Sequence, residues 1–187
     1  DEVGLAIDFS TVIERNRGLY RTFAVVAHDS AVCGATDNTA IFANSGLSRW
    51  SEISYRVPYI GIISSNGEVS EYVGTLDGSI TVHVSDGTTK FKEADFASTS
   101  QPNLILEVTN EKEPGFVGTR RDNSDGLTGK FVILSEGYRE GSGSSQVRNA
   151  NGDVIFRFKR GLTLVGFSDN QNPVKLGFID TCDGSVL

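Results

Sequence analysis

Residues 59–87 read YIGIISSNGEVSEYVGTLDGSITVHVSDG, and this stretch decides the fold class. Three pairs, Asn66-Gly67, Asp77-Gly78 and Asp86-Gly87, stand where hairpin turns need residues that tolerate a positive φ. The apolar runs between these pairs have the usual lengths of β-strands. The stretch therefore predicts an antiparallel meander, which is typical of an all-β protein.

The same meander predicts a register that conflicts with one of its own residues. Tight two-residue turns place Ile60 opposite Val73, and Val73 opposite Val82, in one apolar row across three strands. The next row on that face then places Glu71 among aliphatic side chains, where an unpaired carboxylate is costly to bury. Either one turn is longer than two residues, or Glu71 is paired, or this face is not core at Glu71. We favour an error in the register.

A short helix is predicted near the N-terminus. Thr11 and Glu14 have the spacing of a capping box, and Gly18 suits the end of a helix, so the helix is expected over residues 12–17. Ahead of it, apolar and polar residues alternate from Leu5 to Phe9. This alternation predicts a first strand or an extended N-terminal arm within residues 1–10.

Strands recur along the rest of the chain. Residues 20–28 are apolar on both faces, which is typical of a central strand that is covered on two sides or lies against a neighbouring subunit. Asn151-Gly152 marks a strong hairpin. Further strands are predicted at residues 39–43, 104–109, 131–134, 146–150, 153–160, 162–167 and 174–179. Together these elements predict a single domain over residues 1–187, either a jelly-roll-like antiparallel two-sheet sandwich or a flattened β-barrel.

Charge and hydropathy exclude some classes of partner. The chain has 187 residues and a net charge of −7, which argues against direct, sequence-specific binding of nucleic acid through its phosphates. No apolar run approaches the roughly 20 residues of a membrane helix, so membrane insertion is not expected. A hydrophobic content of 38% is that of a folded globular chain.

No catalytic pattern in the sequence is persuasive. His28-Asp29-Ser30 contains the residue types of a hydrolase triad, but successive side chains on a strand point to opposite faces. The GLTGK segment at residues 126–130 lacks the spacing and the hydroxyl of a phosphate-binding loop. Asp and Glu are numerous enough for a carboxylate-pair hydrolase, yet no particular pair stands out. We therefore predict a protein that is not an enzyme and has no cofactor.

Cysteines and acidic loops offer structural alternatives. Cys33 and Cys182 either form a disulfide that closes most of the chain or remain two separate buried thiols. Asp122, Asp125 and Asp169 lie in Asx-rich loops that could supply about half of the oxygens that Ca²⁺ needs. Because such residues also occupy ordinary turns, a structural turn is the favoured interpretation over a weak calcium site.

Two functions follow as hypotheses. The first is a structural subunit that assembles with copies of itself, in a virion component such as a tail tube or capsid, or in an extracellular filament. The alternative is a secreted carbohydrate-binding or adhesin module, in which exposed aromatic rings stack on sugars. Tyr72, His83 and Tyr138 are predicted to face a partner or a glycan. Both hypotheses place the protein in a virion or at the cell surface or beyond it.

Overall fold

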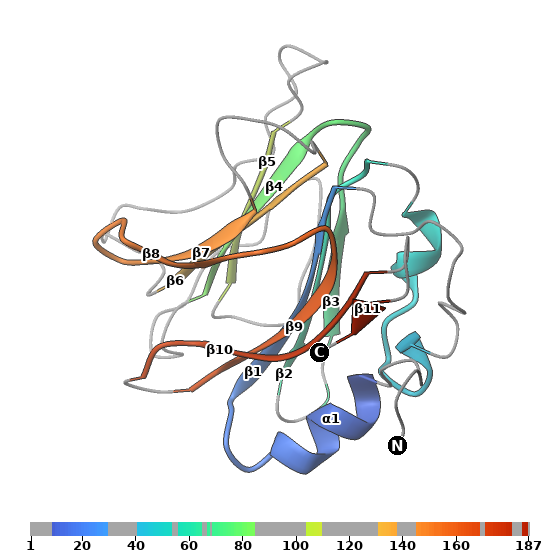
Figure 1. Ribbon diagram of the computed structural model, residues 1–187, viewed down its shortest axis with the longest axis vertical. Helices are drawn as coiled ribbons and strands as arrows, with labels where there is room; N and C mark the ends of the chain where they lie inside the picture. The colour runs from blue at the N-terminus through green and yellow to red at the C-terminus, as the bar shows by residue number, and fades with distance from the viewer. Residues whose placement is uncertain are drawn as a thin grey trace.

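The computed structural model describes residues 9–29, 41–53, 56–64, 67, 69–84, 104–109, 131–137, 145–168, 171–180 and 185–186. This part of the chain is mostly β (Figure 1). Its helices are α1 (Phe9–Asn16) and the 3-10 helix η1 (Arg49–Glu52). Its strands are β1 (Thr22–His28), β2 (Tyr59–Ser64), β3 (Val69–Val73), β4 (Ser79–Val84), β5 (Leu104–Thr109), β6 (Phe131–Glu136), β7 (Gln146–Asn149), β8 (Val154–Arg157), β9 (Gly161–Phe167), β10 (Val174–Asp180) and β11 (Ser185–Val186).

The strands form two separate antiparallel sheets, which confirms a sandwich instead of a closed barrel. The six-stranded sheet has the order β11-β10-β9-β1-β2-β3, and the five-stranded sheet has the order β5-β4-β6-β7-β8. Each sheet ends in edge strands, whereas a closed barrel has none. In Figure 1, β8 of one sheet and β10 of the other run along the same side of the molecule.

β1 lies between two apolar clusters, as expected for a central strand. Ala24 and Val26 belong to the core between the two sheets. Phe23, Val25 and Ala27 belong to a second cluster with α1 and residues 41–53 on the outer face of the six-stranded sheet. Burial of apolar area drives both contacts, at about 25 cal/mol per Å². The second apolar face of β1 is therefore covered within the chain and needs no neighbouring subunit.

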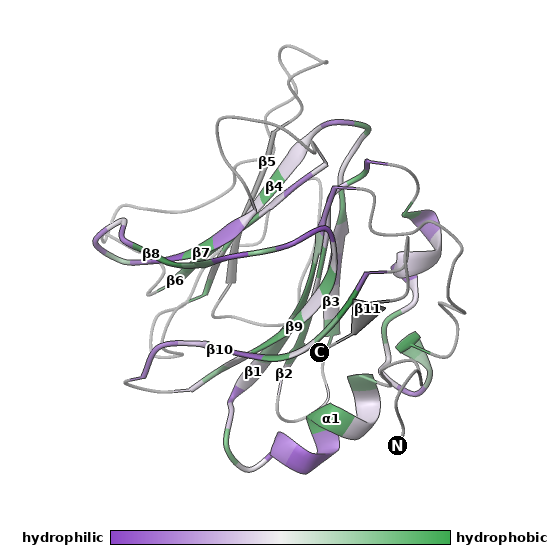
Figure 2. Ribbon diagram, viewed as in Figure 1, coloured by the Kyte–Doolittle hydropathy of each residue, from purple (hydrophilic) through white to green (hydrophobic). Residues whose placement is uncertain are grey.

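The helix α1 is present, but it begins three residues earlier than predicted. Phe9 and Ile13, four residues apart, are both buried against the sheet, and burying this stripe outweighs the predicted cap at Thr11. Glu14 pairs with Arg17, with 2.7 Å between Oε2 and Nη2, instead of closing a capping box. Figure 2 shows α1 with green and pale residues over its N-terminal part and hydrophilic residues at its C-terminal end. Residues 1–8 of the predicted arm lie outside the described residues, and Phe9 is helical.

The β2–β3 hairpin forms with a register one residue away from the prediction. Ile60 pairs with Tyr72, and Val73 pairs with Tyr59. Gly67, at φ +94°, donates its N–H to the Ser64 carbonyl at 3.0 Å, so the turn is longer than a two-residue turn. A loop with one additional residue ending in a left-handed glycine is a common hairpin alternative. A shift by one residue moves every side chain of β3 to the other face.

The predicted pairing of β3 with β4 is wrong. β4 pairs with β5 and β6 in the five-stranded sheet, so the chain crosses between sheets at Asp77-Gly78. Val73 therefore does not lie opposite Val82. The third turn, Asp86-Gly87, lies outside the described residues. The strand predicted at residues 39–43 is also wrong, because Ile41 and Phe42 are helical.

Candidate functional site

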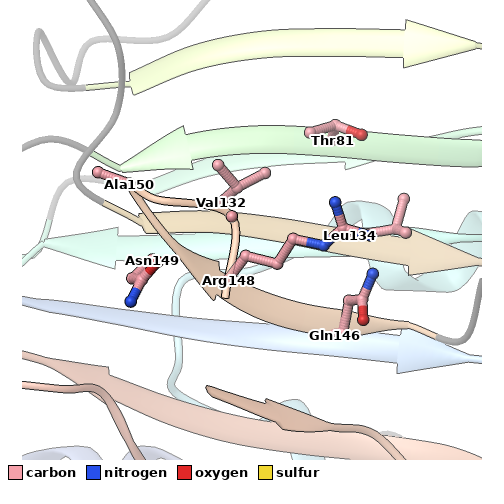
Figure 3. A pocket seen from close by; sticks show the side chains of 8 residues that line it. Thr81, Val132, Leu134, Gln146, Arg148, Asn149 and Ala150 are labelled. Carbon is pink, nitrogen blue, oxygen red and sulfur yellow. The ribbon is translucent and has the colours of Figure 1, made fainter. Parts of the chain in front are cut away.

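A hollow of about 360 Å³ lies on the outer face of the five-stranded sheet (Figure 3), and we call it the outer hollow. Side chains alternate across a strand, so the neighbours of core residues such as Val82, Ile133 and Val147 face outward here. The register then places Leu134 beside Thr81 on one strand and beside Gln146 on the other. The residues that line the outer hollow are Thr81, Val132, Leu134, Gln146, Arg148, Asn149, Ala150 and Gly152.

The outer hollow combines an apolar floor with hydrogen-bond donors. Arg157 donates from Nη1 to Oε1 of Gln146 at 3.1 Å, and this bond orients the amide of Gln146, a residue only 2% exposed. Figure 3 shows the amide nitrogen of Gln146 on the Leu134 side, and the Arg148 side chain extended along the sheet toward both residues. Arg148 is exposed, and within the described part of the chain it makes no ion pair. Among the described residues that line the hollow, none is acidic.

A second polar cluster joins the two sheets at the end of β1, and we call it the seam. His28 Nδ1 lies 2.7 Å from Ser145 Oγ, which also accepts a hydrogen bond from the Glu136 N–H at 2.8 Å. Burial lowers the pKa of His28, while the Asp29 carboxylate and a hydrogen bond to the backbone of Glu136 act in the opposite direction. Because Ser145 is fully buried, its hydroxyl is positioned to hold strands together and not to attack a substrate.

The seam continues at Ser135, which is also fully buried. Its hydroxyl donates to the Ala27 carbonyl and accepts the Tyr59 N–H at 3.1 Å. One side chain of β6 therefore binds the backbones of β1 and β2 in the opposite sheet. Buried backbone groups that are not paired are costly, so this contact contributes to stability.

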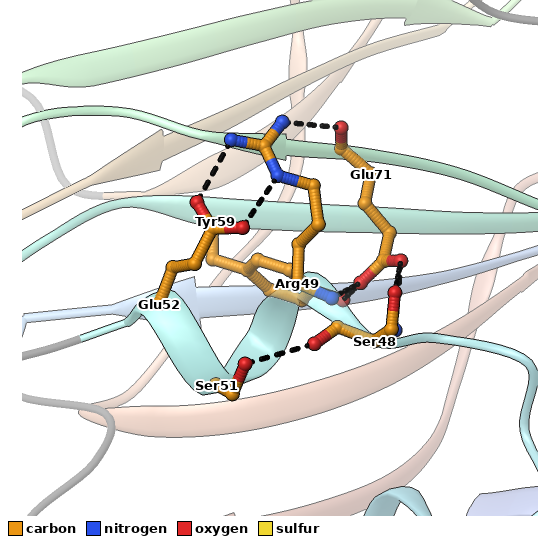
Figure 4. Close-up of polar contacts among 6 residues, drawn as sticks. All are labelled: Ser48, Arg49, Ser51, Glu52, Tyr59 and Glu71. Atoms are coloured by element: carbon orange, nitrogen blue, oxygen red, sulfur yellow. Dashed lines mark hydrogen bonds and ion pairs between the residues drawn. The ribbon is translucent and has the colours of Figure 1, made fainter.

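A third cluster, around Glu71, explains the conflict seen in the sequence (Figure 4). Glu71 accepts hydrogen bonds from the N–H of Arg49 at 2.7 Å, the N–H of Ser48 at 2.8 Å and the hydroxyl of Tyr59 at 2.8 Å. Arg49 in turn binds Glu52 through two nitrogen atoms, each at 2.9 Å. Burial and the Glu71 carboxylate raise the pKa of Tyr59 well above its ordinary value. Two of the three suggested explanations hold, since the β2–β3 turn is longer than two residues and Glu71 is paired.

The predicted site residues do not come together in the described part of the chain. Tyr72, expected to face a partner or a glycan, is 2% exposed and packs in the core between the sheets, so that prediction is wrong. The one-residue register shift is the reason. His83 lies in β4 opposite Val132, which lines the outer hollow. The other candidates lie outside the described residues: Cys33, Cys182, Asp122, Asp125, Asp169 and Tyr138.

Two further features are absent from the described residues. These residues contain no group of three or more His, Cys, Asp or Glu side chains placed to hold a metal ion. Among the same residues, no helix combines the length and the apolar character needed to cross a membrane.

The outer hollow was not predicted from the sequence, although a signal for it exists. Residues 131–134 are apolar at every position, so Val132 and Leu134 must face outward when Phe131 and Ile133 face the core. Gln146 and Arg148 could have been placed beside them only with the pairing of β6 and β7 known. No protein-family model, curated protein or solved structure matches this chain.

Proposed function

We propose that this chain is a non-enzymatic structural subunit that assembles with further copies of itself. The setting that we infer is a virion component, such as a tail tube or capsid, or an extracellular filament. The proposal rests on one observation, the exposure of large apolar side chains on β8 and on β10. Val154 of β8 is 39% exposed and Val174 of β10 is 44% exposed, although both are large apolar residues.

β8 is also an edge strand, which supports contact with a second copy. β8 ends the five-stranded sheet, and an edge strand carries unpaired backbone groups that can bind another strand. Lys175 of β10 donates to the Arg157 carbonyl at 2.8 Å, and its ammonium lies 5.1 Å from the centre of the Phe156 ring. These contacts hold the edge in place. The short length of β8 and the neighbouring cations restrict strand pairing at this edge to a defined partner.

The hydrogen bonds of the polar side chains also favour a structural role over a catalytic one. His28, Ser145 and Ser135 are engaged in the seam between the sheets. Glu71 holds η1 against β3. These groups stabilise a rigid scaffold, as a subunit that bears mechanical or packing contacts requires.

The carbohydrate-binding alternative has less support from the aromatic residues. Tyr59 and Tyr72 are in the core. Trp50 is half-buried and stacks on Phe42, with the ring centres 4.9 Å apart. These three rings are therefore engaged in packing.

The test is the state of association of the purified protein, measured by light scattering over a range of concentrations and by negative-stain imaging. We expect oligomers, rings or tubes, and we expect Val154→Lys together with Val174→Lys to shift the protein toward monomer. Leu19→Lys is the matched control, because Leu19 is 67% exposed and lies in the turn after α1, outside both β8 and β10. A wild-type chain that stays monomeric at high concentration would contradict the proposal.

A further inference from the structure

We propose that the outer hollow binds an organic carboxylate that carries an apolar body. The carboxylate contacts Arg148 and Gln146, and the apolar body lies on Val132 and Leu134. This inference concerns a ligand site on a sheet face and does not depend on assembly through β8 and β10.

The floor of the hollow has the dimensions of a short carbon chain. Val132 and Leu134 are two residues apart on β6, so their side chains emerge about 7 Å from each other on the same face. Thr81 and Gln146 flank Leu134 on the neighbouring strands, each about 5 Å away. A volume of about 360 Å³ is that of a small-ligand site.

The polar atoms at the rim require a ligand that accepts hydrogen bonds. The oxygen of the Gln146 amide is occupied by Arg157, so the amide is oriented with its N–H groups toward the hollow. That nitrogen makes no hydrogen bond with the described residues, and Gln146 lines the hollow. A ligand oxygen in the hollow would accept a hydrogen bond from this N–H group.

The charge of the rim selects an anion. The guanidinium of Arg148 provides a planar pair of donors that matches a carboxylate, and the described residues of the lining include no acidic side chain. A phosphate ester fits less well, because its higher charge and three oxygens need more donors than one guanidinium and one amide. A cationic ligand would meet Arg148 with no acid to balance it among the described lining residues.

The experiment follows backbone amide signals of ¹⁵N-labelled protein by NMR during titration with hexanoate, with hexanol and hexyl phosphate as comparison ligands. We expect hexanoate to shift signals of β4, β6 and β7 in the millimolar range and to bind more tightly than either comparison ligand. Arg148→Gln should weaken hexanoate binding about tenfold or more, since it removes a charge-assisted pair of hydrogen bonds. Arg148→Lys keeps the positive charge but lacks the planar pair of N–H donors. Its affinity for hexanoate should therefore lie between those of the wild type and Arg148→Gln.

Arg15→Gln is the matched control, because Arg15 is an exposed residue of α1 and loses the same charge. It should leave hexanoate binding unchanged. The site would be refuted by the absence of shifts in β4, β6 and β7, by equal shifts in Arg148→Gln, or by hexanol binding as well as hexanoate.

The carboxylate could be a free molecule or an acidic side chain of another copy, and the same variants separate these sources. If Arg148→Gln also lowers the association measured by light scattering, the carboxylate belongs to a second copy. If association is unchanged while hexanoate binding is lost, the ligand is a free carboxylate. Val154 pairs with Arg148 between β8 and β7, so Val174→Lys alone, on β10 of the other sheet, tests the structural proposal separately.

Discussion

Ser135→Ala should destabilise the sandwich strongly, because this one hydroxyl connects the two sheets. Ser135 is fully buried in β6 and binds the backbones of Ala27 and Tyr59 in the opposite sheet. Alanine fits the same space, so the substitution removes hydrogen bonds without creating a large cavity. The Tyr59 N–H and the Ala27 carbonyl then each lose a partner in the interior.

The magnitude follows from the cost of leaving buried polar groups unsatisfied. Each such group costs about 1–3 kcal/mol, so we expect the free energy of unfolding to fall by about 3 kcal/mol. For a chain of this length, that loss corresponds to a decrease in Tm of about 6–12 °C. Since domains are typically stable by about 5–15 kcal/mol, the variant should still fold.

Urea unfolding followed by circular dichroism measures this change directly. The control is Ser51→Ala, since the exposed Ser51 hydroxyl also donates to a backbone carbonyl, that of Ser48, at 3.1 Å. We expect the control to lie within about 0.5 kcal/mol of the wild type. If Ser135→Ala were no more destabilising than Ser51→Ala, the seam would not be a stabilising contact.

Three further predictions concern other contacts of the fold. Gly137→Ala should lower the free energy of unfolding by about 1–3 kcal/mol, because an added Cβ would clash with the Arg56 carbonyl oxygen. Gly18→Ala, with open space around it, should be neutral in the same urea assay. The free energy of unfolding should fall as the pH drops below about 6.5. Burial lowers the pKa of His28 in the folded chain, so the unfolded chain binds this proton at a higher pH than the folded chain does. His28→Gln should flatten this part of a plot of urea midpoint against pH. Glu71→Ala should speed proteolysis within η1 about tenfold or more, as two backbone N–H groups lose a charged acceptor.

Local patterns predicted the elements whose signals lie within a few residues of one another. The Asn151-Gly152 hairpin formed between β7 and β8, and the doubly apolar strand at residues 20–28 became the central strand β1. Both depend on turn chemistry or alternation that the chain carries locally. The outward position of Val132 and Leu134 is of the same kind, since it follows from the alternation in β6.

Predictions failed where the choice between alternatives is made by distant residues. Asn66-Gly67 suits either a two-residue turn or a longer one, and the observed register buries Tyr72 in the core while Glu71 binds η1. Thr11 suits a helix cap, yet packing of Phe9 on the sheet extends the helix past it. In each case a few kcal/mol from tertiary contacts exceed a smaller local preference.

By itself, the sequence determined an antiparallel β protein with one short N-terminal helix, because alternation and glycine turns are properties of neighbouring residues. Only the tertiary structure decided that the chain crosses to a second sheet at Asp77-Gly78, and that β4, β6 and β7 together form the outer hollow. A strand can satisfy its backbone equally well with any suitable neighbour. The partner it takes is therefore decided by which side chains are buried together across the whole fold.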